Sequence, residues 1–331
     1  MNRYSKSVRI GIAAGVGVFC LCFFGTVIIR AAVRTFSDPT AASMLMYLQT
    51  GRVVRFQPVE EPVIQEAIIP EETQATTAPT QPEEEVLAVF AQNDVQLVQV
   101  HSYCGYDTNV TTWLEQPLHW NLKQTEPTVL IIHSHATEGY EDSQDSGYRT
   151  VDTDSNIVSV GTALKNALEE KGIGVIHDTT LHDSPSYSDS YANSRETVKA
   201  YLEQYPSIAL VLDIHRDAVT EDDGEEMEFS AQHNGQKVAQ LMLVVGTDAG
   251  GLTHPDWESN MSLAVKLHAQ LEKNCAGICR PISFRSQRFN QDLSPGALII
   301  EVGGTGNTQQ QALASVEILS QAIYTLAAGT R

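Results

Sequence analysis

From about Val86 onward, short apolar runs alternate with segments in which apolar residues recur every three or four positions. The run Thr128–Ile132 is continuous and stops at polar residues, as in a strand that a parallel sheet buries on both faces. Asn156 then predicts the N-cap of an amphipathic helix that ends at Gly172. The same pattern predicts strands at 173–177, 208–214, 237–246 and 297–302, and helices that begin at Ser194, at Ser259 or Asn260, and at Gln309. Strands separated by helices of this length predict an α/β domain with a twisted, mostly parallel sheet flanked by helices.

The chain before this domain contains one long uncharged stretch, 10–29, between Arg9 and Arg30. At about 1.5 Å per residue the stretch extends over roughly 30 Å, the thickness of the hydrocarbon core of a bilayer. Arg30 interrupts the position at which a signal peptidase would cleave, so we predict an uncleaved transmembrane helix at 10–29. A slight excess of basic residues before the stretch predicts that 1–9 are cytoplasmic and that the folded part is extracytoplasmic.

The segment that follows has a different composition. Residues 60–85 read EEPVIQEAIIPEETQATTAPTQPEEE, rich in Pro, Thr and Glu and without a period. Such a composition cannot bury a core and repels itself, so it predicts a solvated tether. We therefore predict a juxtamembrane segment and disordered tether at 30–85 and an extracytoplasmic domain at 86–331.

Charge and cysteine content narrow the possible partners. Among 331 residues, 21 Lys and Arg face 41 Asp and Glu, which gives a net charge of −20. This excess of negative charge argues against nucleic-acid binding and against attachment to anionic lipid by charge. The five cysteines do not form the pattern of a disulfide framework, and the oxidation state of the neighbouring pair Cys275 and Cys279 stays open.

Candidate chemistry follows three of the predicted strands. The first strand is followed by His133, His135 and Glu138, the strand at 208–214 is followed by His215, and the last strand contains Glu301. Ligands of such sheets bind beyond the carboxyl ends of the strands, and imidazole with carboxylate suits Zn²⁺. Glu301 is placed to take a proton from a zinc-bound water. An enzyme alternative is a phosphoesterase with two metal ions, which needs further bridging carboxylates.

Several motifs in one order resemble the stage II sporulation protein P family of endospore-forming bacteria. They are IIHSHATEGY, VDTDSNIVSVGTAL, DIHRDA, HPDWESN, FNQDL and LIIEVGGTGNT, and the resemblance runs from about Val95 to the C-terminus. The family is similar in turn to zinc-dependent N-acetylmuramoyl-L-alanine amidases, which implies an amidase-like α/β sheet. Where the sporulation family motif has Thr between two histidines, this chain has Ser134, which keeps the hydroxyl.

The resemblance also implies a ligand set with one zinc ion per chain. By position, His135, His215 and Glu301 match the two histidines and the final carboxylate of the zinc amidases. The carboxylate ligand is either Glu138, which we favour slightly, or Asp152, which lies where the amidases have Glu but is shorter. His133 is either an alternative ligand or a residue that supports the ligands.

Four further residues are candidates for binding substrate. Arg216 has the planar fork that suits a peptide carboxylate or a developing oxyanion, although an ion pair with Asp213 or Asp217 is the competing interpretation. We also interpret Trp257 and Asn260 as lining a glycan or peptide groove and Asn290 as a donor to a substrate carbonyl, with loop packing and capping as the alternatives.

The implied function is that of a membrane-anchored peptidoglycan hydrolase. It would cleave the amide between glycan strand and stem peptide, and also peptide cross-links, during engulfment of the forespore. The resemblance further implies sporulation proteins D and M of the same stage as partners, and a location at the sporulation septum or engulfing membrane. The rival from another class is a non-catalytic scaffold that binds the cell wall with the same fold.

Overall fold

The structure is a computed structural model that describes residues 92–329 except 119, 123–125, 144–147 and 221–223. The predictions for 1–9, for the membrane span at 10–29 and for the tether at 30–85 lie outside the described residues. Within the described part of the chain, no helix has both the length and the apolar character needed to cross a bilayer.

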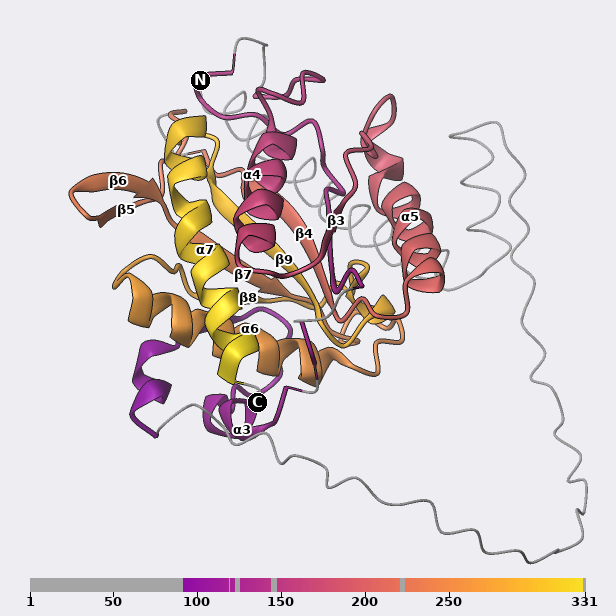
Figure 1. Cartoon of the computed structure of the whole chain (residues 1–331), viewed down its shortest axis with the longest axis vertical. Coiled ribbons are helices and arrows are strands. Elements are labelled where there is room, and N and C mark those ends of the chain that lie inside the picture. The colour runs from indigo at the N-terminus through magenta and orange to yellow at the C-terminus, as the bar shows by residue number, and fades with distance from the viewer. Residues whose placement is uncertain (1–91, 119, 123–125, 144–147, 221–223, 330–331) are drawn as a thin grey trace, which may run out of the picture. The chain divides into compact units, whose positions relative to one another are not determined.

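A mixed sheet forms the centre of the described domain (Figure 1). Its seven strands lie in the order β1-β8-β7-β9-β4-β2-β3. The strands are β1 (Val100–Ser102), β2 (Val129–Ile132), β3 (Val175–His177), β4 (Leu210–Asp217), β7 (Leu241–Val245), β8 (Ile282–Phe284) and β9 (Ala297–Gly304). All neighbours are parallel except β7 and β9, which confirms a mostly parallel sheet. A separate hairpin consists of β5 (Ser230–His233) and β6 (Gln236–Ala239).

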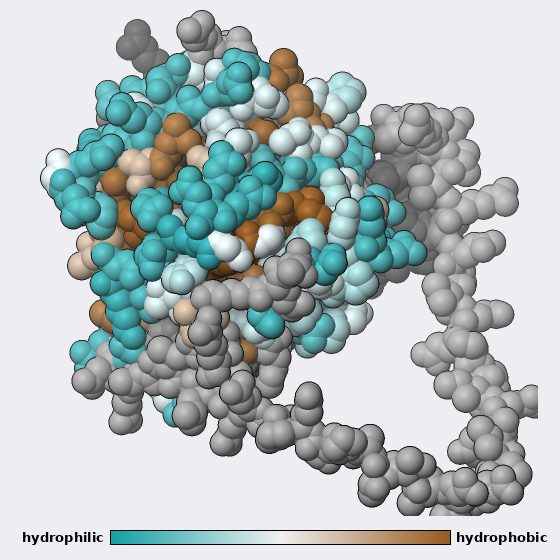
Figure 2. All heavy atoms as spheres, viewed as in Figure 1, coloured by the Kyte–Doolittle hydropathy of each residue, from teal (hydrophilic) through white to brown (hydrophobic). Residues whose placement is uncertain are grey.

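Helices cover both faces of the sheet, as the alternation of strand side chains requires. Val129 and Ile131 of β2 face the main core with α4 (Ile157–Glu170), α6 (Trp257–Asn274) and α7 (Gln309–Gly329), whereas Leu130 and Ile132 pack with α5 (Ser190–Gln204). The remaining elements are α3 (Val110–Glu115) and the 3₁₀ turns η1 (Gln92–Leu97), η2 (Tyr187–Asp189) and η3 (Gln291–Leu293). Hydrophilic side chains cover much of the face seen in Figure 2, as the net charge of −20 leads one to expect.

The predicted helix from Asn156 to Gly172 is confirmed at both ends. The Asn156 side chain accepts a hydrogen bond from the Val158 amide at 2.9 Å, and Gly172 adopts a φ of +79° beyond the last turn. Two other helices begin a few residues earlier in the chain than the sequence predicts. Helix α5 begins at Ser190, and Ser194 instead turns its hydroxyl inward to Ser134 at 2.9 Å. Helix α6 begins at Trp257, so Ser259 and Asn260 lie inside its first turn.

The predicted strand at 237–246 is in fact two strands. Gln240 separates β6 from β7, because its amide bonds to the Phe229 carbonyl and its own carbonyl accepts the Gly303 amide. The cysteine pair that the sequence left open is present as two free thiols, Cys275 and Cys279.

The carboxyl ends of β2, β4 and β9 meet at one edge of the sheet. In the register of β4 and β9, His215 is paired with Glu301, so both side chains point to the same face. The register then shifts, and Asp217 pairs with Gly304. The irregularity contains Gly303 at a φ of +70°, where a Cβ atom would lie 2.7 Å from Asn307 Oδ1. A glycine there allows the shift of register between β4 and β9, two residues after Glu301.

Candidate metal centre

Three side chains meet beyond β2 and at the end of β4. His135 and Glu138 lie in the turn after β2, and His215 lies in β4. His135 Nδ1 is 3.5 Å from Glu138 Oε1, and His215 Nδ1 is 3.4 Å from Glu138 Oε2. One donor atom from each of the three residues lies within 4.8 Å of the other two. No other group of three His, Cys, Asp or Glu residues in the described ranges has this spacing.

The donor set fits a zinc ion. Bonds of about 2.0–2.2 Å at tetrahedral angles separate two donor atoms by roughly 3.3–3.6 Å. The observed separations of 3.5 and 3.4 Å agree with this range, although each histidine faces a different carboxylate oxygen. Two imidazoles and one carboxylate form a ligand set that catalytic zinc sites use, with a fourth position kept for water.

Asp213 fixes the orientation of the His215 ring. Its Oδ1 accepts hydrogen bonds from His215 Nε2 at 2.8 Å and from the Ser134 amide at 2.7 Å, and its Oδ2 accepts the Ser134 hydroxyl. An ionised carboxylate only accepts, so Nε2 carries a proton, and Nδ1, which faces Glu138, is the nitrogen that could offer its lone pair to a metal ion. Burial lowers the pKa of His215, but the charge of Asp213 and hydrogen bonds to Asp213 and Glu138 outweigh it and hold that pKa well above its usual value.

Glu138 is held as a buried anion. Burial raises the pKa of its carboxyl, but hydrogen bonds from His135 and His215 and the charges of His215 and Arg216 outweigh burial and hold the pKa well below its usual range. The Arg216 amide donates to Glu138 Oε2 at 3.1 Å, and the Ile157 amide donates to the Glu138 carbonyl at 2.8 Å. Glu138 is therefore fixed through both its backbone and its side chain.

Glu301 lies beside His215 with an incompletely bonded carboxylate. Its Oε2 is buried and has no hydrogen-bond partner among the described residues, although the residue as a whole is partly exposed. Burial raises the pKa of Glu301 to about 8, and the negative charges of Glu138 and Asp217 act in the same direction. The charges of His215 and Arg216 oppose the shift without cancelling it. A carboxyl group with this pKa can both accept and release a proton near neutral pH.

Aromatic side chains from η2 and α5 surround His135. The Tyr187 ring stacks on the imidazole with centroids 4.5 Å apart, and the Tyr191 ring meets it edge-on at 5.4 Å. The Arg149 guanidinium lies 4.4 Å from the centre of the Tyr187 ring and bonds to Asp183 at 2.9 Å. These contacts restrict the ring plane of His135.

The two alternative ligands lie apart from the three clustered residues. His133 Nδ1 donates to the Ile214 carbonyl at 2.8 Å, and its Nε2 lies 2.9 Å from His177 Nε2. Asp152 is exposed and accepts hydrogen bonds from the Ser155 hydroxyl at 2.7 Å and the Asp154 amide at 3.2 Å. Of the two carboxylates that the sequence left open, the structure brings Glu138 and not Asp152 to the histidines.

The side chains of the four substrate-binding candidates all interact with other parts of the protein. Arg216 is buried, and its side chain donates to the Gly139 and Tyr148 carbonyls at 2.8 Å each and lies 3.7 Å from Glu138, so it pairs with neither Asp213 nor Asp217. Asn260 is fully buried and donates to the Gln291 carbonyl at 3.0 Å. Asn290 donates to the Tyr191 carbonyl and Ser194 hydroxyl, and Trp257 packs on Tyr106 and Phe284. None of the four is within the cluster of three.

Sequence reasoning missed the residues that support the ligands. The position of Asp213 beside His215 could have been predicted from spacing, because residues i and i+2 of a strand lie on the same face and His215 follows Asp213 by two positions. No comparable pattern in the sequence indicates Tyr187, Tyr191 or Arg149, because η2, α5 and the segment before α4 bring them to the site from other parts of the chain.

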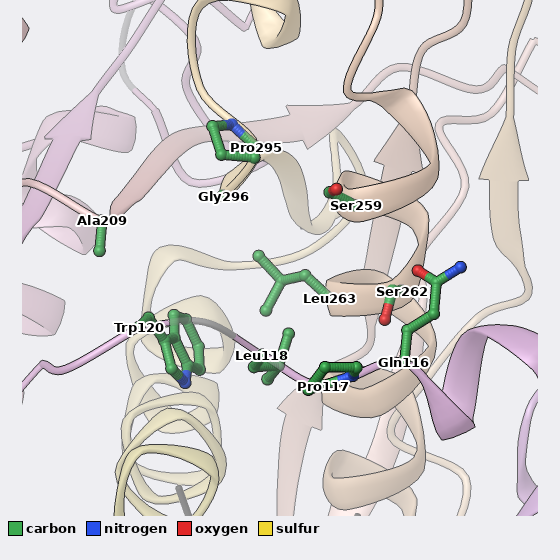
Figure 3. Close-up of a pocket in the computed structure, with 10 residues that line it drawn as sticks. All are labelled: Gln116, Pro117, Leu118, Trp120, Ala209, Ser259, Ser262, Leu263, Pro295 and Gly296. Atoms are coloured by element: carbon green, nitrogen blue, oxygen red, sulfur yellow. The ribbon is translucent and has the colours of Figure 1, made fainter. Parts of the chain in front are cut away.

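Two open spaces differ in their relation to these residues. A cavity of about 180 Å³ is lined by Trp120, Leu118 and Leu263 and by Ala209 and Gly296 (Figure 3). Ala209 and Gly296 directly precede β4 and β9, so this cavity lies at the opposite edge of the sheet. A second, more open pocket of about 450 Å³ is lined in part by Tyr191, whose ring contacts His135.

Comparisons with known proteins agree on a family. The family model for stage II sporulation protein P (SpoIIP) matches residues 39–324. Stage II sporulation protein P of Bacillus subtilis (strain 168) is 29% identical over 223 residues, which cover 60% of this chain and 52% of that protein. The chain thus spans about half the length of this curated relative.

Solved amidase structures show a distant similarity of fold. The N-acetylmuramoyl-L-alanine amidase AmiC2 of Nostoc punctiforme has a TM-score of 0.36 and 16% identity, with 61% of this chain and 95% of that chain covered. The CwlD amidase from Clostridioides difficile, solved in complex with the GerS lipoprotein, has a TM-score of 0.38 and 15% identity, with 60% and 94% covered.

Proposed function

Because this chain belongs to the stage II sporulation protein P family, we propose that it is a membrane-anchored, zinc-dependent peptidoglycan hydrolase. It cleaves the amide that joins the glycan strand to the stem peptide, and it also cleaves peptide cross-links. One observation carries the proposal: the donor atoms of His135, Glu138 and His215 converge within 4.8 Å, and the buried carboxylate of Glu301 lies on the adjoining strand.

In this proposal His135, Glu138 and His215 hold one zinc ion. When bound, zinc polarises a carbonyl and lowers the pKa of a coordinated water to about 7. Asp213 keeps the proton of His215 on Nε2, which leaves Nδ1 free to bind. Stacking on Tyr187 holds the His135 ring in one plane.

Glu301 is the general base and then the general acid. Its carboxylate takes a proton from the attacking water and passes it to the departing amine. The pKa of Glu301, raised to about 8 by burial, supports this role, because such a group can bind and release a proton near neutral pH. Arg216 is buried nearby, and its positive charge lowers the pKa of Glu301, which favours the ionised carboxylate.

The setting of the activity is proposed from the sequence. The uncharged stretch at 10–29 would anchor the chain, and the segment 30–85 would hold the hydrolase domain away from the bilayer on its extracytoplasmic side. Family membership supports action at the sporulation septum and engulfing membrane, together with sporulation proteins D and M of the same stage.

Metal content and wall digestion, measured together, test the proposal. The full-length chain is purified beside His215→Ala, Glu301→Gln and, as a matched control, His101→Ala, which changes an exposed histidine. We expect one zinc per chain in the wild type, Glu301→Gln and the control, and less in His215→Ala. Stem peptides with new N-terminal amines should be released from purified peptidoglycan only by the wild type and the control.

Each alternative gives a different result. Wall binding without zinc or digestion would support the non-catalytic scaffold. Retention of two metal ions with release of phosphate from a phosphoester would support a phosphoesterase. Digestion by Glu301→Gln at the wild-type rate would remove Glu301 from the mechanism.

A further inference from the structure

The pocket that adjoins the metal centre is lined by aromatic and apolar side chains and by one arginine. It has a volume of about 450 Å³ and is lined by Tyr191, Leu252, Gln287, Arg288 and Phe289, together with Gly250 and Ser286. Tyr191 connects it to the metal centre, since its ring lies 5.4 Å from the His135 ring and 5.8 Å from the Phe289 ring. A substrate that reaches the metal centre can therefore extend into this pocket across a single aromatic side chain.

Arg288 brings a cation to the pocket and shares its carboxylate partner, Asp292, with a second arginine. The nearest carboxylate, Asp292, already receives two hydrogen bonds from Arg195, at 2.7 and 2.6 Å. Arg288 Nε lies 3.2 Å from Asp292 Oδ1 but makes no hydrogen bond, and its Nη1 donates to the Thr253 carbonyl at 3.2 Å. No hydrogen bond from its Nη2 occurs among the described residues, although the side chain is only 21% exposed. The guanidinium is thus oriented and retains donors for a ligand.

The wall that carries Arg288 is held against the neighbouring loop. A Cβ atom on Gly246 would lie 2.3 Å from the Gln287 carbonyl oxygen, and one on Gly250 would lie 2.5 Å from the Ser286 carbonyl oxygen. The Gly250 amide donates to that Ser286 carbonyl at 2.9 Å. Only glycine allows the two loops to approach so closely, so the pocket wall is fixed before any ligand binds.

The backbone at Phe289 is strained in the same wall. Phe289 has a φ of +53°, a left-handed conformation that is unfavourable for a bulky residue. Such conformations persist where the surroundings impose them, and they cluster at binding and catalytic sites. Here the conformation brings the aromatic ring to the pocket beside Tyr191.

We propose that this pocket binds the acidic stem peptide of the substrate, with Arg288 donating hydrogen bonds to a free peptide carboxylate. The inference rests on the proposed function, because it takes peptidoglycan as the substrate. Of the two parts of peptidoglycan, the stem peptide carries free carboxylates, whereas a strand of N-acetylated sugars offers hydroxyl and amide groups. An oriented arginine that shares its one carboxylate partner, Asp292, with Arg195 and keeps free N–H donors favours the peptide. Phe289, Tyr191 and Leu252 would contact the apolar parts of its side chains.

Binding of soluble fragments tests the inference without any catalytic step. The full-length wild type, Arg288→Gln and Arg288→Lys are titrated calorimetrically with a stem tripeptide that has free carboxylates, with its amidated counterpart and with an oligosaccharide of N-acetylglucosamine, which has no carboxylate. The control is Arg285→Gln, which removes a neighbouring arginine whose guanidinium lies over Tyr103. Far-UV circular dichroism verifies that each variant is folded.

We expect the wild type and Arg285→Gln to bind the acidic peptide at least tenfold more tightly than the amidated one. Arg288→Gln should weaken acidic-peptide binding by about 10- to 100-fold and remove the preference, because a hydrogen bond to a charged group is lost. Arg288→Lys should lie between, since it keeps the charge and loses the fork. Equal binding of the acidic peptide by Arg288→Gln and the wild type, or stronger binding of the glycan, would overturn the inference.

A second measurement separates this inference from the proposed function. On peptidoglycan substrates that differ only in stem amidation, Arg288→Gln should raise KM for the free-acid form and leave kcat within about twofold, because Arg288 does not touch the reacting bond. A wild type that digests neither substrate but binds the acidic peptide through Arg288 would refute the hydrolase and keep the pocket assignment. A wild type that digests both with equal kcat/KM would refute the pocket assignment alone.

Discussion

Glu301→Gln should stabilise the metal-free protein while it abolishes hydrolysis. Glu301 is a buried carboxyl whose Oε2 has no hydrogen-bond partner among the described residues, and its pKa rises to about 8 from an ordinary value of 4.5. Burial is the main cause, and the charges of Glu138 and Asp217 add to it. Glutamine keeps the shape of the side chain and removes the ionisation.

The sign of the effect follows from the direction of the pKa change. A carboxyl whose folded pKa lies above its unfolded pKa contributes stability that is complete below about pH 4.5 and is lost as the pH rises through about 8. The gap between these two pKa values corresponds to about 5 kcal/mol, at about 1.4 kcal/mol per pKa unit. Water that enters the site stabilises the ionised form, so we expect roughly half of this, about 2–3 kcal/mol above pH 8.

Urea unfolding at a series of pH values measures this effect. Wild type and Glu301→Gln are stripped of metal with a chelator and unfolded between pH 4.5 and 8.5, followed by tryptophan fluorescence. The free energies of unfolding should agree near pH 4.5, and Glu301→Gln should become progressively more stable. Glu317→Gln, which changes an exposed carboxylate paired with Lys171, should follow the wild type within about 0.5 kcal/mol. This expectation would be refuted if the difference in unfolding free energy between the two proteins did not change with pH, or if Glu301→Gln were less stable than the wild type at pH 8. Either result would mean that burial does not raise the pKa of Glu301.

Three further substitutions test the supports of the site and of the fold. Asp213→Asn keeps the shape beside His215 but removes the charge, so zinc affinity should fall by about 10- to 100-fold in a chelator competition; an affinity within twofold of the wild type would contradict this role. Gly161→Ala should destabilise the protein by roughly 1–3 kcal/mol in urea although alanine is the better helix former, because its Cβ would lie 2.5 Å from His133 Nε2; a more stable variant would contradict the packing. Asn156→Ala removes the N-cap of α4 and leaves buried backbone groups unpaired, so it should cost about 1–3 kcal/mol in thermal or urea unfolding, and a loss below about 0.5 kcal/mol would show that water replaces the cap.

The strands that carry the candidate site were predictable because their signal is local. Parallel strands buried on both faces read as continuous apolar runs, and Thr128–Ile132 and Ala297–Val302 stand out as such. The polar residues directly after or at the end of such runs then lie at one edge of the sheet, which is how His135, His215 and Glu301 were selected. The helix from Asn156 to Gly172 was equally visible, since both of its ends carry capping residues.

The rest depends on contacts between distant segments. Ser194 looks like an N-cap by residue type, but the structure uses its hydroxyl to bond Ser134, which lies 60 positions earlier in the chain. The antiparallel pairing of β7 with β9 also has no local signature, because a strand reads the same in either direction. Glu138 and Asp152 both precede α4, and only the path of the turn after β2 decides which carboxylate reaches the histidines.

The electrostatics of the site favour a bound cation for a reason that does not depend on the relatives. Glu138, Asp213 and Glu301 lie around His215, and burial makes several anions in one place unfavourable. In the metal-free chain the site compensates in two ways: the pKa of His215 is well above its usual value, so the ring keeps a proton, and the pKa of Glu301 rises to about 8. In the proposed function a metal ion would supply the same positive charge, and its binding would displace the proton from His215 and allow Glu301 to ionise. Several buried carboxylates in one place lower the stability of the fold when no cation is bound, and Glu301 Oε2 also lacks a hydrogen-bond partner among the described residues. Such a cost is typical of a site that is retained for function rather than for folding.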